Sequence, residues 1–386
     1  MTTRRVTPVV ERSAQRNTGS SARRGKATVN VAAPTSLAEG GPVNMHNGPA
    51  GVIWDITYAC PLRCMHCYSE SGRRPSRQPS HGELLRIAEA LASLRAQEVA
   101  IAGGEPLLVR GLFEIIERFS RVGSPVVLYT SGWTVDAALA EELLRTVHGV
   151  AVSLDGATAE VHDRIRGRMF SFERAVRALE LLDEASRALK ARGETPGVFG
   201  VEVAVMRSNH HQVEAFCSDI APRFPEMRHL VFGVTIPAGL ASREGFVDHE
   251  LLDDEQVRRL CDPGTLTFLK ALAPTGLRVA VEDNRREMMH PDSVAKGEAL
   301  PVMHVTPDGD VHAMPIYEGR VGNVLDESPH VLWERALARR SDPFVVETLA
   351  PVVTMRDWAQ AVRRIDRHFG SAEDLARIGR RSAFRL

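Results

Sequence analysis

Residues 52–67 read V-I-W-D-I-T-Y-A-C-P-L-R-C-M-H-C. The first six residues are mostly apolar and β-branched, which predicts a buried strand that ends just before the cysteines. Cys60, Cys64 and Cys67 have the spacing C-x3-C-x2-C, and thiolates are soft ligands that suit iron–sulfur clusters. Three thiolates on a four-iron cube leave one iron able to chelate a small molecule. The stretch therefore predicts a metal site in the loop after the first strand.

A structural zinc knuckle is the alternative for these cysteines, with His66 or His81 as the fourth ligand. Zinc sites usually combine one pair of close ligands with a second pair farther along the chain. The sequence shows no second pair, so the iron–sulfur interpretation is favoured.

Outward from this stretch, short β-rich runs alternate with segments of helical spacing. Such alternation implies right-handed βαβ units and a parallel sheet. Six units predict an α/β fold, a partial (β/α)6 TIM-like barrel that is open on one side, with its chemistry at the carboxyl ends of the strands. The strands are expected at Val52–Thr57, Val99–Ala102, Val126–Thr130, Val150–Leu154, Phe199–Met206 and His229–Val234, and the helices at Gly82–Ala96, Val109–Val122, Val135–Val147, Ser171–Arg192 and Asn209–Phe224.

Beyond about Thr235 the alternation ends. Val302–Thr306 and Val311–Pro315 flank Pro307-Asp308-Gly309-Asp310, a hairpin turn signature. A helix is expected near Pro329–Arg340. We predict four regions: a disordered basic tail at 1–50, the barrel at 51–235, a small hairpin-plus-helix extension at 236–355 and a helical C-terminal tail at 356–386.

The composition is that of a globular protein, with 44% apolar residues, 25% charged residues and a formal net charge of -1. No apolar run approaches the roughly 18 residues that span a bilayer, so no membrane association is expected. The first 50 residues hold seven lysines and arginines against two glutamates, which predicts a solvated tail, with binding of a partner as the alternative; nucleic acid is not an expected partner. Five cysteines, three of them within eight residues, argue against a disulfide framework and predict a reducing, cytoplasmic location.

With these features the segment Val52–Val234 resembles the radical S-adenosylmethionine (SAM) superfamily. The resemblance implies that Cys60, Cys64 and Cys67 hold a [4Fe-4S] cluster and that its open iron chelates the methionine part of SAM. His66 stands where the family has a residue near the adenine.

Gly103-Gly104-Glu105-Pro106, after the second strand, matches the family's Gly-Gly-Glu-Pro motif. Two glycines let the backbone approach a ligand closely, and Glu105 offers an acceptor for the ammonium group of SAM. Thr130-Ser131-Gly132, after the third strand, resembles the family's Thr-Asn-Gly turn, with Ser131 in place of asparagine.

Ser153-Leu154-Asp155-Gly156, at the end of the fourth strand, resembles a stretch that contacts the ribose and carboxylate of SAM. Ser153 and Asp155 are therefore candidate SAM contacts, and by position Arg164 or Arg166 would bind the carboxylate. Ordinary charges at the start of a surface helix are the alternative for each arginine.

Pro237-Ala238-Gly239-Leu240-Ala241 resembles the Pro-x-Gly-Arg-Ala stretch of a subfamily that modifies peptides and makes haem-type or quinone cofactors, with Leu240 in place of the arginine. The hairpin and Val321-Gly322-Asn323 resemble the C-terminal extension of that subfamily, called SPASM or, when shortened, twitch. That extension normally carries cysteines for auxiliary clusters. Here Met314 stands where a ligand is expected and no cysteine follows Cys261, so the extension is predicted to be degenerate.

The two other cysteines receive different predictions. Cys217 shares a helical stripe with Val213, Phe216 and Ile220, which predicts a core position. Cys261 follows the last strand of the barrel, where a thiol of radical epimerases donates a hydrogen atom to the product radical. A small buried residue is the alternative for Cys261.

The resemblance implies an enzyme that takes an electron from a flavodoxin- or ferredoxin-type donor, cleaves SAM to a 5'-deoxyadenosyl radical and abstracts a hydrogen atom. The first substrate hypothesis is a natural-product intermediate such as a sugar, a nucleoside or another small metabolite; the second is a ribosomally made peptide. Because auxiliary-cluster cysteines are lacking, epimerisation or rearrangement is favoured over oxidation. A non-catalytic iron–sulfur scaffold is the alternative of another class.

Overall fold

A computed structural model describes residues 48–74 and 77–385. The predicted tail at 1–50 therefore lies outside the described residues, apart from its last three. Within the described chain, ten strands form one sheet in the order β10-β9-β8-β1-β2-β3-β4-β5-β6-β7. Their bounds are β1 Gly51–Thr57, β2 Glu98–Gly103, β3 Val126–Thr130, β4 Gly149–Ser153, β5 Val198–Val205, β6 His229–Val234, β7 Arg278–Glu282, β8 Val302–Val305, β9 Asp310–His312 and β10 Arg320–Asn323.

The strands β1 to β7 pair in parallel with their sequence neighbours, and the sheet is not closed. β8 pairs in parallel with the other side of β1, and β9 and β10 follow it as antiparallel strands. The predicted partial barrel is thus confirmed, and each of the six expected strands is present. The strands of the predicted extension continue the barrel sheet.

Strand β7 was not predicted. Its five residues, Arg278 to Glu282, begin and end with a charged residue and lie where the βα alternation was expected to have ended. β7 nevertheless pairs with β6 over its whole length. The parallel part of the sheet is therefore one strand longer than predicted on this side.

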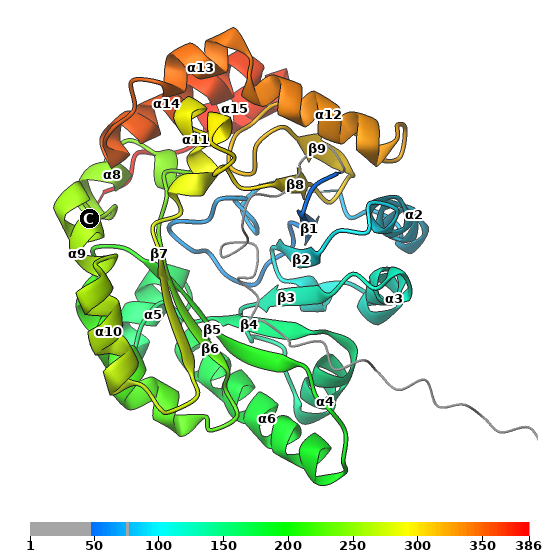
Figure 1. The fold of residues 1–386 in the computed structure, drawn as a ribbon, viewed down its shortest axis with the longest axis vertical. Helices are drawn as coiled ribbons and strands as arrows, with labels where there is room; N and C mark the ends of the chain where they lie inside the picture. The colour runs from blue at the N-terminus through cyan, green and yellow to red at the C-terminus, as the bar shows by residue number, and fades with distance from the viewer. Residues whose placement is uncertain (1–47, 75–76, 386) are drawn as a thin grey trace, which may run out of the picture. The chain divides into compact units, whose positions relative to one another are not determined.

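The helices of the barrel lie on the outer face of the curved sheet (Figure 1). The alternation of β1 explains this, because Val52, Trp54 and Ile56 are fully buried toward the helices while Ile53 faces the interior. Local signals fix the helix ends: Ser80 and Glu83 form a capping box at the start of α2. The helices are α2 His81–Ala92, α3 Leu112–Val122, α4 Ala137–Thr146, α5 Ala159–Arg166 and α6 Ser171–Ala191.

The helix predicted at Asn209–Phe224 is wrong as a continuous element. The segment consists of short pieces: η3 His210–Gln212, α7 Val213–Ala215, the π-helical η4 Phe216–Ile220 and η5 Ala221–Arg223. Pro222 lies in the last piece, and proline cannot donate the backbone hydrogen bond that a longer helix needs. Cys217 lies in η4 and is fully buried in the hydrophobic core, as predicted.

After β6 the chain forms several short helices before and after the hairpin. The hairpin of β8 and β9 is confirmed, and α12 has the predicted bounds, Pro329–Arg340. The predicted helical C-terminal tail is two helices, separated at Gly370. The remaining elements are η6 Gly239–Ser242, α8 Phe246–His249, α9 Asp254–Leu260, α10 Pro263–Leu272, η7 Arg285–Met288, α11 Pro291–Ala295, α13 Pro343–Leu349, α14 Met355–Phe369 and α15 Ala372–Gly379.

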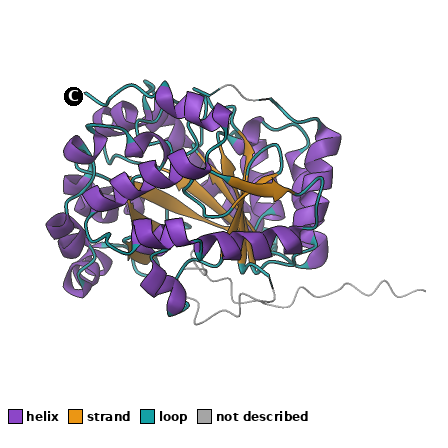
Figure 2. Ribbon diagram, turned by 90° about the horizontal axis from the view of Figure 1, so that it is seen from above, coloured by secondary structure: helices purple, strands orange, loops and turns teal. Residues whose placement is uncertain are grey.

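In the view from above, helices lie to the left and to the right of the strands (Figure 2). None of the helices in the described residues is long and apolar enough to span a membrane.

Candidate active site

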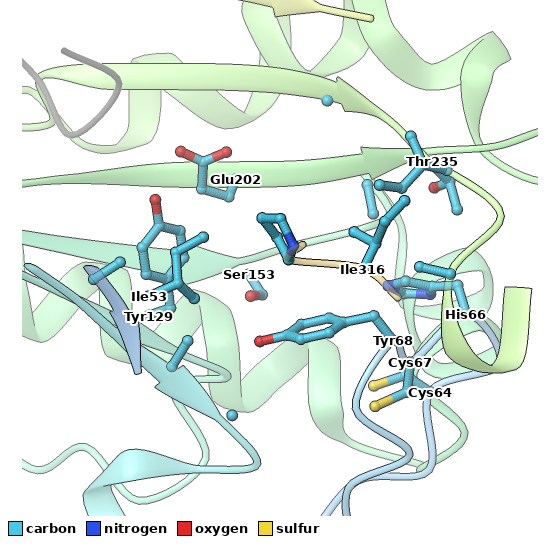
Figure 3. Close-up of a pocket in the computed structure, with 18 of the residues that line it drawn as sticks. Ile53, Cys64, His66, Cys67, Tyr68, Tyr129, Ser153, Glu202, Thr235 and Ile316 are labelled. Carbon is cyan, nitrogen blue, oxygen red and sulfur yellow. The ribbon is translucent and has the colours of Figure 1, made fainter. Parts of the chain in front are cut away.

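A cavity of about 460 Å³ opens between the carboxyl ends of the strands and the barrel interior. Its wall brings together residues that follow or end β1, β2, β3, β4 and β6, although these segments are far apart in the chain. The predicted site residues that line it are Cys60, Cys64, His66, Cys67, Gly103, Gly104, Ser131, Ser153 and Arg166. Figure 3 shows Cys64 and Cys67 with their sulfur atoms side by side at one end of this cavity.

The three cysteines lie in a loop, Tyr58–Arg74, that we call the cysteine loop. Its middle pairs with the last turn of α5: the Arg63 amide donates to the Arg166 carbonyl at 3.0 Å and the Met65 amide to the Ile165 carbonyl at 2.9 Å. This pairing fixes the distance between the cysteines and the Arg166 side chain. The last cysteine of the motif is held separately, because the Leu240 amide donates to the Cys67 carbonyl at 3.0 Å.

Gly239 explains the Pro-x-Gly stretch after β6. The residue has φ +51°, and a Cβ atom there would lie 2.0 Å from the Tyr68 carbonyl oxygen. Only glycine permits this close contact. The stretch thus packs against the end of the cysteine loop, and Arg243 strengthens the contact by donating to the Met65 carbonyl at 2.8 Å.

Gly104 has the same function on the opposite side of the cysteine loop. A Cβ atom at Gly104 would lie 2.2 Å from the Ala59 carbonyl oxygen, and the next amide, that of Glu105, donates to this same carbonyl at 2.8 Å. Gly104 therefore lets the turn after β2 approach the start of the cysteine loop. Pro106 is buried and begins the short helix η2, Pro106–Leu108.

Glu105 does not line the cavity, contrary to the role predicted for it. Its side chain is fully buried, and each carboxylate oxygen accepts two hydrogen bonds. Oε1 accepts from the Thr130 hydroxyl at 2.8 Å and the Leu107 amide at 3.2 Å, and Oε2 accepts from the amide and hydroxyl of Ser131. The acceptor positions expected for an ammonium group are thus filled by the turn after β3. Glu105 instead joins the turns that follow β2 and β3.

Arg166, rather than Arg164, reaches the cavity. The Arg166 Nε lies 2.6 Å from Oδ2 of Asp155, and its Nη1 lies 3.8 Å from the Cys64 sulfur. Arg164 is exposed and is not part of the cavity wall. Burial raises the pKa of the Asp155 carboxyl, but the charges of Arg166, His66 and His162 outweigh burial and hold that pKa below its usual value.

Asp155 itself is fully buried behind the cavity wall. One of its oxygens accepts from the Ala204 amide at 2.8 Å, which ties the turn after β4 to β5. The other oxygen faces Arg166 and lies 3.7 Å from Nε2 of His66. Asp155 therefore positions Arg166 and His66, and it does not face a ligand directly.

The donor set fits a bound cluster and a bound organic ligand. Burial raises the pKa of the Cys60 thiol to about 12 and that of the Cys64 thiol to about 11. Cationic iron favours thiolates at such positions. Nδ1 of His66 is buried in the cavity wall without a hydrogen-bond partner among the described residues, which is an open position for a ligand atom.

A single metal ion fits the described residues less well. Among the described residues, no group of three or more His, Cys, Asp or Glu side chains is placed to hold a metal ion. The zinc alternative therefore gains no support from the described part of the chain, whereas a cube binds one thiolate at each of three irons.

Cys261 is not among the residues that line the cavity. It follows the last residue of α9, is partly exposed and packs against the hydrophobic core. The geometry thus gives no support to the predicted hydrogen-atom donor and agrees better with the alternative of a structural residue.

Sequence reasoning missed a polar network that joins the cysteine loop, β1 and β8. The Tyr68 hydroxyl donates to Oδ1 of Asp55 at 2.5 Å, and Nε2 of His304 lies 3.1 Å from Oδ2. Asp55 is 1% exposed and lies in the middle of β1. A carboxylate inside an apolar strand was the available signal, because such a group needs partners when it is buried.

A buried ion cluster, also missed, fastens the C-terminal helix to the cysteine loop. Arg377 of α15 pairs with Glu70 of the loop and, at 2.5 Å, with Glu318. Arg381 lies 2.7 Å from the same Glu70 oxygen. Glu70 lies about 300 residues before both arginines in the chain, so no local pattern could have indicated this contact.

The sequence profile described as the Radical SAM superfamily matches residues 54–199. This match runs from β1 into β5, and it contains the three cysteines and the motif turns that surround the cavity. The chain carries a radical SAM domain. The cofactors of this family are a [4Fe-4S] cluster and SAM, and the donor set described above fits both.

Curated relatives extend this result beyond the domain profile. The radical SAM domain is 35% identical over 179 residues to mycofactocin maturase MftC of Mycolicibacterium smegmatis, covering 46% of this chain and 43% of that one. It is 34% identical over 145 residues to the AdoMet-dependent heme synthase of Methanosarcina barkeri, covering 37% of this chain and 42% of that one. The chain thus spans less than half the length of the curated relatives that it matches.

Solved structures agree on the fold. Streptococcus suis SuiB bound to S-adenosylmethionine superposes with a TM-score of 0.57 at 14% identity, covering 74% of this chain and 66% of that one. This likeness concerns the fold alone, and it confirms the predicted barrel of the radical SAM domain. The domain and its relatives identify the chain as an enzyme, so the scaffold alternative is not supported.

Proposed function

We propose that this protein is a radical SAM maturase that modifies a ribosomally made peptide. The observation that carries the proposal is the 35% identity with mycofactocin maturase over 179 residues. From the sequence alone, a small natural-product intermediate is the first substrate hypothesis and a peptide the second. The relatives support the reverse order.

The haem synthase relative makes a tetrapyrrole the second candidate. A tetrapyrrole carries carboxylate groups, yet the interior of this cavity is lined by Glu98, Glu202, Glu282 and Glu287. A substrate carboxylate placed among them would cost free energy, because it would either raise their pKa values further or bring like charges together. This lining favours a peptide over an anionic macrocycle.

In the proposed enzyme, Cys60, Cys64 and Cys67 hold the cluster. When bound, the cluster and SAM together supply a 5'-deoxyadenosyl radical that can take a hydrogen atom from an unactivated C–H bond. Arg166 lines the cavity next to Cys64 with its charge oriented by Asp155, which suits the SAM carboxylate. His66, Ser131, Ser153 and the backbone at Gly103 and Gly104 supply further polar contacts on the same wall.

The electron source and the net reaction belong to the same proposal. A flavodoxin- or ferredoxin-type protein reduces the cluster, in the cytoplasm. With no cysteine beyond Cys261, a redox-neutral change of the peptide, such as epimerisation or rearrangement, needs no second cluster as an electron acceptor. Oxidation would require return of an electron to the SAM cluster or to an external carrier.

The test uses the anaerobically reconstituted enzyme with SAM, dithionite and short peptides encoded beside its gene. We expect one peptide to stimulate 5'-deoxyadenosine formation and to be changed chemically, as seen by mass spectrometry in deuterated water. Cys64→Ala is the matched control without turnover. Stimulation by a sugar or a nucleoside, with no response to any encoded peptide, would restore the first hypothesis from the sequence.

A further inference from the structure

The cavity has a second end that the cofactor residues do not explain. Four acidic side chains line it, each from a different element: Glu98 of β2, Glu202 of β5, Glu282 of β7 and Glu287 of η7. Figure 3 shows Glu202 and Tyr129 pointing into the cavity at the end opposite Cys64 and Cys67. We call this group of four glutamates, with Tyr129 and His304, the carboxylate end.

The carboxylates lie close enough to influence one another. Burial, followed by the charge of Glu282, raises the pKa of Glu287 to about 7. Burial and the charges of Glu282 and Glu98 raise the pKa of Glu202 well above its usual value, although Arg278 opposes this effect. Arg278 opposes the rise at Glu202 and His304 opposes it at Glu287, yet both pKa values stay raised.

Two acceptor atoms at this end lack a partner among the described residues. One is Oε1 of Glu202, and the other is Nδ1 of His304, whose side chain is 5% exposed and lines the same cavity. Nε2 of His304 lies against Oδ2 of Asp55, so in the neutral ring the proton belongs on Nε2 and Nδ1 is an acceptor. Buried acceptors without donors cost free energy, which a ligand rich in donors would recover.

Glu98 and Glu282 have partners of their own, so the inference rests on Glu202, Glu287 and His304. Because burial and mutual repulsion raise the pKa values of Glu202 and Glu287, a cation would stabilise their ionised forms, whereas an anionic ligand would raise these pKa values further. A bound metal ion has no support, because the described residues contain no group of three or more such ligands placed to hold one. An ammonium or guanidinium group consists only of donors and carries the complementary charge.

We propose that the carboxylate end binds a cationic side chain of the substrate between Glu202, Glu287 and His304. This proposal rests on the proposed function, in which the cation is a lysine or arginine of the peptide. Anchoring it at this end places the neighbouring part of the peptide between the carboxylates and the thiols. The site thus selects the residue that is presented to the cofactor end.

The experiment measures binding of small probes to the anaerobically reconstituted enzyme with SAM, by saturation-transfer NMR and calorimetry. The probes are N-acetyl-lysine amide, N-acetyl-arginine amide and the uncharged N-acetyl-norleucine amide. We expect at least one cationic probe to bind about 10-fold more tightly than norleucine amide, as a charge-assisted contact implies. Preference for lysine or arginine amide then distinguishes an ammonium from a guanidinium ligand.

Glu202→Gln and Glu287→Gln should each weaken binding of the preferred cation about 10-fold. Glu117→Gln, on the exposed face of α3, is the matched control and should leave binding unchanged. Two separate variants keep the test decisive if one of them fails to fold, and retained iron content reports folding. The proposal would be overturned if norleucine amide bound as tightly as the cationic probes. It would also be overturned if Glu202→Gln and Glu117→Gln changed the affinity for the preferred cation equally.

The test of the carboxylate end can fail or succeed independently of the test of peptide maturation. Binding of a cationic probe without modification of any encoded peptide would keep the site and reject peptide maturation. Modification of a peptide at the same rate by wild type and by both glutamine variants would keep peptide maturation and reject the site.

Discussion

The two ends of the cavity are built in different ways. The thiol end consists of loops that directly follow strands, and its residues are close neighbours in the sequence, such as Cys60 to Cys67 or Gly103 to Pro106. The carboxylate end consists of single side chains on separate elements, such as Glu202 in β5 and Glu287 in η7. The residues of the thiol end thus stand in contiguous motifs, whereas those of the carboxylate end are dispersed along the chain and come together only on folding.

The largest expected effect is at the thiol end. Cys60→Ala, Cys64→Ala and Cys67→Ala should each abolish formation of 5'-deoxyadenosine, because each removes a ligand of the cluster. The barrel should stay folded, since its sheet has its own apolar core. Circular dichroism and product analysis by chromatography check this. Retained 5'-deoxyadenosine in any one variant would contradict the assignment of that cysteine.

Iron content provides the control for this prediction. The wild type should hold about four irons per chain after reconstitution, as one four-iron cube implies. The triple cysteine-to-alanine protein should hold almost none, because Cys217 is in the core and Cys261 lies outside the cavity wall. A residual cluster with its own paramagnetic resonance signal would show that the C-terminal extension binds iron, and would weaken the case for redox-neutral chemistry.

The next effect sharpens the comparison, because the C-terminal helix α15 contacts the cysteine loop at the thiol end through Arg377 and Glu70. Arg377→Met leaves Glu70 and Glu318 without their central partner; the Arg377 side chain is 7% exposed. Leaving a buried charge with no partner costs about 3–5 kcal/mol; because Arg381 still lies 2.7 Å from Glu70 and 3.8 Å from Glu318, we expect a loss below this range. Arg335→Met, which breaks an exposed pair with Glu327, should cost less than about 1 kcal/mol. Urea unfolding compares the two; equal losses would mean that the cluster does not hold the cysteine loop.

Prediction from sequence was most successful where structure is local. The expected strand Val99–Ala102 lies inside β2, Glu98–Gly103, and the helix Pro329–Arg340 has its predicted bounds. Apolar alternation and capping residues act over a few positions, so a sequence window contains them. β7 and the broken segment around Phe216 failed because pairing with β6 and a π-helical turn depend on distant packing.

The same distinction applies to the candidate site. The three cysteines, His66 and Arg166 come from the predicted motifs and all line the cavity, while their roles stay predictions. Glu105 was assigned to a ligand, yet its four acceptor positions are filled by the turn after β3, a neighbour only in space. Glu202 and His304 carry no motif, so only the barrel geometry reveals them.

A smaller effect is expected at Glu105. In Glu105→Gln the amide nitrogen replaces one oxygen that accepts two hydrogen bonds, so buried donors of Ser131 or of Thr130 and Leu107 lose their acceptor. Such a loss costs about 1–3 kcal/mol. We therefore expect a lower unfolding midpoint in urea, measured with and without SAM. An unchanged midpoint together with weaker SAM binding would restore the direct contact with the ammonium group that the sequence suggested.

The smallest expected effect is on the pH dependence of folding stability, and it tests the carboxylate end through Glu287. The folded-state pKa of Glu287 is about 7, above its usual value of 4.5. A carboxyl group with a raised pKa favours the folded state while it is protonated, and this contribution is lost as pH rises through about 7. Burial raises this pKa most, the charge of Glu282 raises it further, and the charge of His304 lowers it. Glu287→Gln removes the ionisation, so the variant should lose less stability than wild type between pH 6 and pH 8.

The measurement is the difference in thermal midpoint between Glu287→Gln and wild type at pH 6 and at pH 8. We expect the difference to favour the variant more strongly at pH 8, because wild type carries an unfavourable charge there. Glu117→Gln should show no such change, since its carboxylate is exposed and paired with Arg121. N-acetyl-lysine amide should reduce the difference in thermal midpoint between Glu287→Gln and wild type at pH 8, because a bound cation stabilises the ionised carboxylate. A difference independent of pH would mean that Glu287 is already neutralised by the protein, and the carboxylate end would then have no charge left for a substrate.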